Sequence, residues 1–175
     1  MDERSGPARG HDTQAAPQTR PAETVVAAPL DRPALLDRPF DRDEIAVVRH
    51  QVSSALRLVG LVGDRLQGFV LAVNEVITNV VLHAGGHGRI VLWLTGGSAW
   101  CTVTDSGPGI PEHYLRPPEM PEAFKVGGRG IWLAYQLCDE VSMAIGPIGT
   151  TVGMRIALPR RDQVSGLVSG ASANG

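Results

Sequence analysis

The chain has 175 residues, enough for one domain with a substantial core and too few to expect a second. Its 16 basic and 18 acidic residues give a formal net charge of -2, so no overall field favours nucleic acid or an anionic membrane as partner. The N-terminus lacks the pattern of a signal peptide, and no apolar stretch reaches the ~18 residues of a membrane span. We therefore expect a soluble, cytoplasmic protein.

The first segment, residues 1–39, contains no aromatic residue and six of the thirteen prolines. It buries too little apolar surface to offset its ordering entropy, so we predict a disordered arm. Within it, Thr24–Leu30 is a short apolar island with the composition to dock onto a domain. Residues 161–175 are rich in Ser, Gly and Ala, which predicts a flexible tail. The working domain is then residues 40–160.

Two helices are predicted at the start of this domain. A capping-box pattern at Asp41 opens the first, whose apolar stripe runs over residues 45–59. The same pattern at Asp64 opens the second, which ends near Ala84 ahead of several glycines.

Four strands follow in two hairpins, separated by a predicted helix over residues 131–138. The first hairpin pairs Arg89–Leu94 with Ala99–Thr104, and the second pairs Val141–Ile145 with Thr151–Leu158. Helices segregated from strands in this way predict an α/β (α+β) two-layer sandwich, with helices on one face of a mixed, mostly antiparallel sheet.

The second predicted helix carries a carboxylate and a carboxamide one turn apart, at Glu75 and Asn79. Side chains at i and i+4 point the same way, here away from the stripe that should pack on the sheet. A solvated helix face would explain a lone glutamate. Because this face also carries Leu71 and Leu82, we expect it to be covered. A covered carboxylate requires a proton, a metal or a hydrogen-bond partner.

A second motif, Asp105-Ser-Gly-Pro-Gly, follows a predicted strand. Strand alternation places Asp105 on the less polar side, where its carboxylate needs a donor such as an adenine amino group. Gly107 and Gly109 allow the backbone to approach a ligand closely. Taken alone, a plain Asp-Gly turn explains the same residues.

Two further glycine motifs come later in the chain. Gly127–Gly130 precedes a helix, where free amides and the helix dipole favour phosphate, although a flexible capping linker fits equally well. Lys125 and Arg129 add positive charge beside it. The Gly-Thr-Thr run at residues 149–151 opens the last strand and carries almost no weight alone.

Taken together and in order, these motifs resemble the GHKL ATPase superfamily with its Bergerat nucleotide-binding fold, over roughly residues 40–159. The resemblance implies that Asn79 holds Mg²⁺ bridging the ATP phosphates. It implies that Glu75 orients or deprotonates the attacking nucleophile, and that Asp105 accepts from the adenine amino group.

The remaining positions match the family's pocket and lid. Gly107 and Gly109 would shape the adenine pocket, and Thr150 or Thr151 would lie near adenine. Gly128 and Gly130 match the glycines at the hinge of the family's ATP lid, whose amides face phosphate. We also expect Lys125 or Arg129 to contact the γ-phosphate from this lid.

Within the superfamily, the Asn-Glu-x-x-x-Asn motif, the short lid over residues 110–127 and the run Gly-Arg-Gly-Ile-Trp-Leu look like the anti-sigma-factor serine/threonine kinases of bacterial partner switching. We expect neither the dimerisation domain of a sensor kinase in residues 1–39 nor a transducer domain. The resemblance implies a STAS-type antagonist protein as phosphoacceptor, a sigma factor as a further partner, and a homodimer. A binding module that uses ATP without transferring phosphate, and an ATP hydrolase, remain alternatives.

Overall fold

The structure is a computed structural model that describes residues 33–109, 129–146 and 149–159. The described strands form one five-stranded sheet in the order β1-β2-β3-β5-β4. Each neighbouring pair is antiparallel, so the sheet contains no parallel pair among the described strands, where a mixed sheet was expected. The strands are β1 (Leu36–Asp41), β2 (His87–Thr95), β3 (Ser98–Asp105), β4 (Glu140–Gly146) and β5 (Gly149–Ala157).

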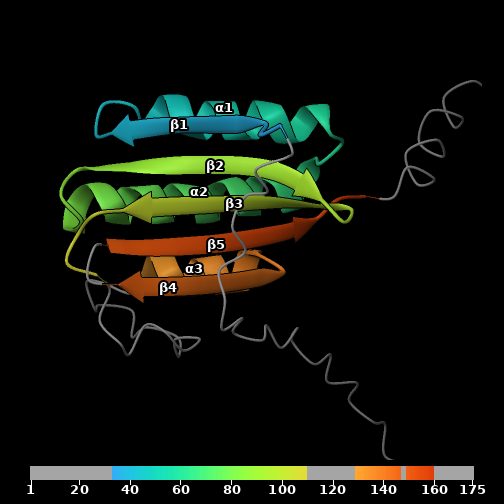
Figure 1. The fold of residues 1–175 in the computed structure, drawn as a ribbon. Coiled ribbons are helices and arrows are strands. Elements are labelled where there is room, and N and C mark those ends of the chain that lie inside the picture. The colour runs from blue at the N-terminus through green and yellow to red at the C-terminus, as the bar shows by residue number, and fades with distance from the viewer. Residues whose placement is uncertain (1–32, 110–128, 147–148, 160–175) are drawn as a thin grey trace, which may run out of the picture.

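Three helices cover one face of this sheet (Figure 1). They are α1 (Ile45–Leu58), α2 (Gly63–His83) and α3 (Arg129–Leu137). α2 lies between the other two and contacts β2, β3 and β5. The predicted two-layer α+β architecture is confirmed.

The core lies between the two layers. In β3, alternate residues face the helices, and Ala99, Cys101 and Val103 are each at most 1% exposed. α2 contributes the largest share of the helix side because it is apolar around most of its circumference. Both cysteines are buried and free, and burial raises the pKa of the Cys101 thiol to about 12.

The first strand was not anticipated. β1 begins at Leu36, so the boundary placed at residue 39 falls inside the sheet. Only Leu36 and Phe40 face the core on this strand, which makes its apolar pattern short. Its outer side is anchored by charge, since Asp37 pairs with Arg89 of β2 at 2.7 Å. The predicted disorder of residues 1–32 and of the C-terminal tail lies outside the described residues.

Both predicted capping boxes are wrong. Asp41 ends β1, and its side chain accepts from the backbone N–H of Asp43 instead of capping a helix. The helix that follows is capped by Glu44 with no side-chain hydrogen bond. α2 likewise starts after Val62 without a side-chain cap, which places Asp64 inside its first turn.

α2 also bears on the membrane question. By length and composition it qualifies as a membrane-spanning helix, with a mean hydropathy of 1.3 over its most apolar window, contrary to the expectation from the sequence. Half of that window is buried inside the fold. The burial is that of the central helix of a folded domain, packed between α1, α3 and the sheet.

Candidate functional site

Most of the predicted site residues that the structure describes converge at one end of the two layers. This end is formed by the C-terminal half of α2, the end of β3, the start of β5 and the start of α3. These segments touch at Gly107, Gly130 and Gly149, because a Cβ on each would stand 3.0 Å or less from a neighbouring segment. The site is therefore built by backbone that approaches closely from several elements.

Glu75 and Asn79 lie beneath the first turn of α3. A Cβ on Gly130 would stand 3.0 Å from both Glu75 Oε2 and Asn79 Nδ2. Both polar side chains are half-buried, and no hydrogen bond or ion pair reaches either one from the described residues. The start of α3 thus covers part of a carboxylate and a carboxamide that have no partner among the described residues.

The expected cover over this face of α2 is only partly present. α3 packs along one side, where Gly68 meets Leu137 and, two turns further on, Gly130 meets the polar pair. Leu71 and Leu82 were expected to be covered, but they are 43% and 60% exposed. Among the described residues, the cover over the polar pair is therefore the short helix α3, and the flanking leucines are exposed.

Asp105 ends β3 with its carboxylate facing the helix layer, and the residue is only 9% exposed. Its Oδ1 accepts from the backbone N–H of Gly107 at 2.8 Å and from that of Thr150 at 3.3 Å. No hydrogen bond from the described residues reaches Oδ2. The two backbone donors fix the carboxylate and leave one oxygen for another donor.

Sequence reasoning missed Gly149 as a site residue. A Cβ there would lie 1.8 Å from the carbonyl oxygen of Asp105, and its φ is +136°. Only glycine lets the start of β5 come this close to the end of β3, which is how the Thr150 N–H reaches Asp105. The available clue was the glycine directly before the two threonines.

Gly107 and Gly109 lie in the turn after Asp105. A Cβ on Gly107 would be 2.5 Å from Ala84, so this turn rests on the C-terminal end of α2. A Cβ on Gly109, which has a φ of +88°, would be 3.0 Å from Ile145 of β4. Ile145 is 37% exposed and gives the site an apolar wall.

The two candidate threonines lie on opposite faces of β5. Thr150 is 2% exposed, and its Oγ1 is buried without a hydrogen-bond partner beside Asp105. Thr151 faces away from the helices, and its hydroxyl is 3.0 Å from that of Thr104 on β3. The structure therefore places Thr150, and not Thr151, with the other site residues.

Of the lid residues predicted from the sequence, Lys125 and Gly128 lie outside the described residues. Arg129 is the first residue of α3 and is exposed. The N-terminus of α3 is directed at the end of the domain where the other site residues meet, as the Gly130 contact shows.

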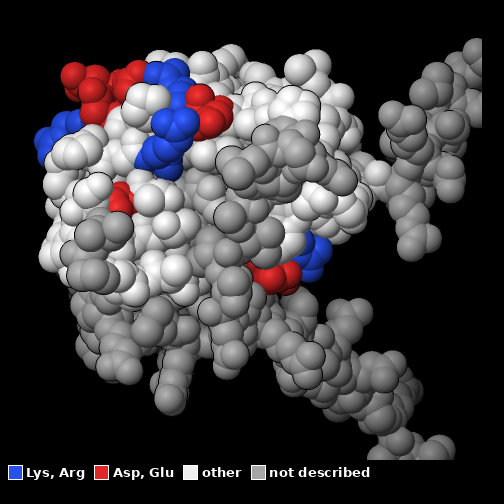
Figure 2. Space-filling view, in the orientation of Figure 1, with Lys and Arg blue, Asp and Glu red and all other residues white. Residues whose placement is uncertain are grey.

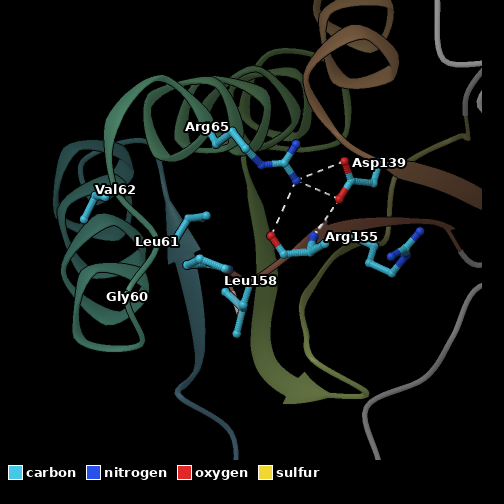
Figure 3. A pocket seen from close by; sticks show the side chains of 9 residues that line it. Gly60, Leu61, Val62, Arg65, Asp139, Arg155 and Leu158 are labelled. Atoms are coloured by element: carbon cyan, nitrogen blue, oxygen red, sulfur yellow. Dashed lines mark hydrogen bonds and ion pairs between the residues drawn. The ribbon is translucent and has the colours of Figure 1, made fainter. Parts of the chain in front are cut away.

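A separate cleft of about 640 Å³ lies at the opposite end of α2 (Figure 3). Arg65 and Asp139 face each other there, with Arg65 Nη2 2.9 Å from Asp139 Oδ2, which also accepts from the backbone N–H of Ala157 at 2.6 Å. Its charged groups are thus paired with one another. None of the predicted site residues lines this cleft.

The described residues fit Mg²⁺-ATP by their donor chemistry. Asn79 offers a carboxamide oxygen, a ligand type that Mg²⁺ accepts, next to the Glu75 carboxylate. Asp105 keeps an acceptor free for an amino group, and the orphaned hydroxyl of Thr150 lies beside it. The apolar surface of Ile145 suits the face of a base.

A family model described as a histidine kinase-like ATPase domain matches residues 39–156. Among solved structures, the chain is similar to one titled mycobacterial sensor histidine kinase MprB, with 21% sequence identity. The match covers 71% of this chain and 100% of that one, with a TM-score of 0.45. No curated protein matches the sequence.

Proposed function

Since the chain belongs to the histidine kinase-like ATPase family, we propose that it binds ATP with Mg²⁺ and transfers the γ-phosphate to a serine or threonine of a partner protein. The observation that carries this proposal is the pair Glu75 and Asn79. It is half-buried under the start of α3, without a protein partner among the described residues, at the end of the domain where Asp105 keeps a free oxygen.

Recognition of the base would rest on Asp105. Its Oδ1 is held by two backbone N–H groups, so Oδ2 is oriented to accept from the adenine amino group. The buried hydroxyl of Thr150 gains a partner when a base or its bound water arrives, which removes the cost of leaving it unpaired. Ile145 would pack against the ring.

Transfer would rest on Glu75. When bound, Mg²⁺-ATP supplies the phosphoryl group and the positive charge that offsets its oxygens. Asn79 is the residue that would hold the metal, and the amides at the start of α3 would face the phosphates. Glu75 would accept the proton of the attacking hydroxyl, a role that typically contributes about 10²–10⁴-fold to the rate.

For the phosphoacceptor we propose a STAS-type antagonist protein in a partner-switching system, with a sigma factor as a further partner. This rests on the resemblance to anti-sigma-factor kinases carried by the Asn-Glu-x-x-x-Asn motif of α2 and the Gly-Arg-Gly-Ile-Trp-Leu run that opens α3. A cytoplasmic homodimer is part of the same proposal.

A transfer assay with γ-labelled ATP and candidate STAS proteins tests the proposal. The full chain should label its partner. Glu75→Gln should bind ATP with unchanged affinity but transfer phosphate about 10²–10⁴-fold more slowly, because the base is lost while the size of the side chain is kept. Asn79→Ala should instead weaken ATP binding in the presence of Mg²⁺.

The alternatives give different results in the same assay. An ATP hydrolase would release free phosphate and leave the partner unlabelled. A binding module would do neither while still binding ATP. Full transfer by Glu75→Gln would contradict the role of this residue. An ATP affinity of Asn79→Ala equal to that of the unchanged protein in the presence of Mg²⁺ would contradict the metal role.

A further inference from the structure

The face of the sheet opposite the helices carries a row of large side chains. The strand register aligns Trp93 of β2, Trp100 of β3, Arg155 of β5 and Glu140 of β4 across four strands. The two tryptophan rings stack with centroids 6.3 Å apart, and the Arg155 guanidinium lies 5.8 Å from the centre of the Trp100 ring. Arg155 Nε in turn bonds Glu140 Oε2 at 2.9 Å.

This face is shielded from water although no described helix or strand lies over it (Figure 1). Trp93 is 1% exposed and Ser142 of β4 is 2% exposed. Trp93 Nε1 and Ser142 Oγ are both buried without a hydrogen-bond partner. One face of an open sheet normally meets solvent, so residues this inaccessible within a single chain indicate that another segment of the chain covers them.

Charged side chains gather at the margins of this face. Figure 2 looks onto it and shows blue and red side chains at its upper left, over β1, and a smaller group at its lower right. The ion pair between Arg89 and Asp37 lies on the β1 side, and that between Arg155 and Glu140 lies near the start of β4. Between these margins, buried residues extend from Trp93 to Ser142.

We propose that residues 24–30 of the same chain, Thr-Val-Val-Ala-Ala-Pro-Leu, lie across this face and cover Trp93. Residues 1–32 contain few aliphatic side chains larger than alanine, namely Met1, Val25, Val26 and Leu30. Three of these four fall within residues 24–30. A segment of Val, Ala and Leu without charge matches the buried centre of this face, where Trp93, Thr102 and Ser142 carry no charge and lie between two charged margins.

The position of β1 allows residues 24–30 of the same chain to reach this face. The backbone N–H of Leu35 donates to the carbonyl of Leu92 at 2.7 Å, so the chain enters the sheet one strand away from Trp93. The four residues between Leu30 and Leu35 span up to about 17 Å when extended, which is ample for a return onto the face.

The length of the segment also fits. Three strand spacings separate β2 from β4, or about 14 Å at about 4.8 Å each. Residues 24–30 span about 20 Å when extended, enough to run from Trp93 to Ser142. Because this segment is tethered to β1, its local concentration exceeds that of any free partner.

Tryptophan fluorescence of the full chain tests the proposal, in a Trp132→Phe background that leaves only Trp93 and Trp100. The double change Val25→Asp and Val26→Asp should shift the emission to the red and raise the quenching by acrylamide. The matched control, Val164→Asp with Val168→Asp, adds the same charge to the other end of the chain and should change neither. Unchanged emission and quenching in the Val25/Val26 variant would overturn the proposal.

A cross-linking measurement covers the case in which the Val25/Val26 variant loses its fold. Cysteines at Ala27 and at Ala144, which is exposed on the outer side of β4, are joined with a short bismaleimide. The native Cys101 and Cys138 are buried and should not react. A linked product of monomer mass supports the proposal. The control carries Ala171→Cys with Ala144→Cys. If the main product has the mass of a dimer, the face belongs to a second copy of the chain. If the yield of linked monomer does not exceed that of the control, residues 24–30 do not cover the face. Either result overturns the proposal.

Discussion

The two ends of the domain differ in whether their polar groups are paired with one another. At the end of α2 that carries Arg65, the charged groups satisfy one another: Arg65 bonds Asp139, and Asp139 in turn accepts from the backbone of β5. At the end that carries Asn79, some 20 Å away along the helix axis, the polar groups are fixed in place but left open. No hydrogen bond from the described residues reaches Asp105 Oδ2, and Thr150 Oγ1 is buried without a partner.

This difference separates a structural end from a binding end more reliably than the size of a hollow does. The described cleft of about 640 Å³ lies at the paired end, where its charges already have partners and offer little to a ligand. At the end that carries Asn79, a ligand that supplies an amino group to Asp105 and a donor or acceptor to Thr150 would bind favourably, because it satisfies buried polar groups. Substitutions matched between the two ends therefore test the assignment.

The largest effect is expected from Gly149→Ala. Its new Cβ would meet the carbonyl oxygen of Asp105 at 1.8 Å, and the positive φ adds strain. The start of β5 must then move away from β3, which separates Asp105 from the Thr150 N–H. We expect a loss of about 3–5 kcal/mol in the free energy of unfolding, measured by urea denaturation, together with loss of ATP binding.

Gly146→Ala in the same hairpin is the control. Gly146 faces Gly149 in the register, but a Cβ there meets nothing within 4 Å. Its free energy of unfolding should change by less than about 0.5 kcal/mol. Equal destabilisation by the two changes would show that the close approach of Gly149 to Asp105 is not what holds this end together.

Asp105→Asn and Asp139→Asn compare the two ends directly. An asparagine at 105 has one acceptor oxygen; if that oxygen keeps the backbone donors, its NH₂ group faces the adenine amino group, donor against donor. We expect ATP affinity to fall by about tenfold or more, as for loss of a hydrogen bond to a charged group. Binding is measured by isothermal titration calorimetry.

Asp139→Asn should leave ATP affinity unchanged. It weakens a half-exposed ion pair with Arg65 and one backbone hydrogen bond, so the free energy of unfolding should fall by about 1 kcal/mol. A comparable loss of ATP affinity in this variant would place the nucleotide at the cleft end and overturn the assignment of the open end.

Two glycines on the α2–α3 interface repeat the comparison at smaller scale. Gly130→Ala brings a methyl group to 3.0 Å from the polar atoms of Glu75 and Asn79, which must shift by a few tenths of an ångström. If Glu75 and Asn79 act as proposed, such a displacement should slow phosphate release or transfer by about tenfold. Gly68→Ala meets Leu137 at 3.2 Å instead and should alter the free energy of unfolding without altering the rate. Equal rates for the two variants would show that the glycine at position 130 is not needed for the reaction.

The sequence predicted the open end better than the start of the fold, for physical reasons. Glu75, Asn79 and Asp105 are recognisable because a helix period and a strand period each fix where a polar side chain points. β1 could not be recognised in the same way. Pro39 and three charged residues occupy four of its six positions, and its pairing with β2 supplies what its own pattern lacks.

The contacts between segments could not be predicted from the sequence either. The two threonines are equivalent as a dipeptide, and only the pairing of β5 with β3 turns Thr150 toward Asp105 and Thr151 toward Thr104. The capping-box prediction at Asp41 was wrong for the same reason, because its side chain accepts a hydrogen bond from the backbone of Asp43 in the turn after β1. Local patterns fix direction along one element, whereas partners depend on contacts that only the folded chain makes.

The smallest expected effect comes from Thr150→Val, and it separates binding from stability most sharply. Valine keeps the shape of threonine and removes a buried hydroxyl that has no partner. In the free protein, removal of an unpaired group should raise the free energy of unfolding by up to about 1 kcal/mol. ATP affinity should nevertheless fall several-fold if this hydroxyl is satisfied by the bound base or its water.

Ser142→Ala is the control, since it removes the other buried and unpaired hydroxyl of the described strands, on the face away from the site. It should stabilise the free protein similarly and leave ATP affinity unchanged, so equal affinities of the two variants would show that Thr150 is orphaned for a reason unrelated to the nucleotide.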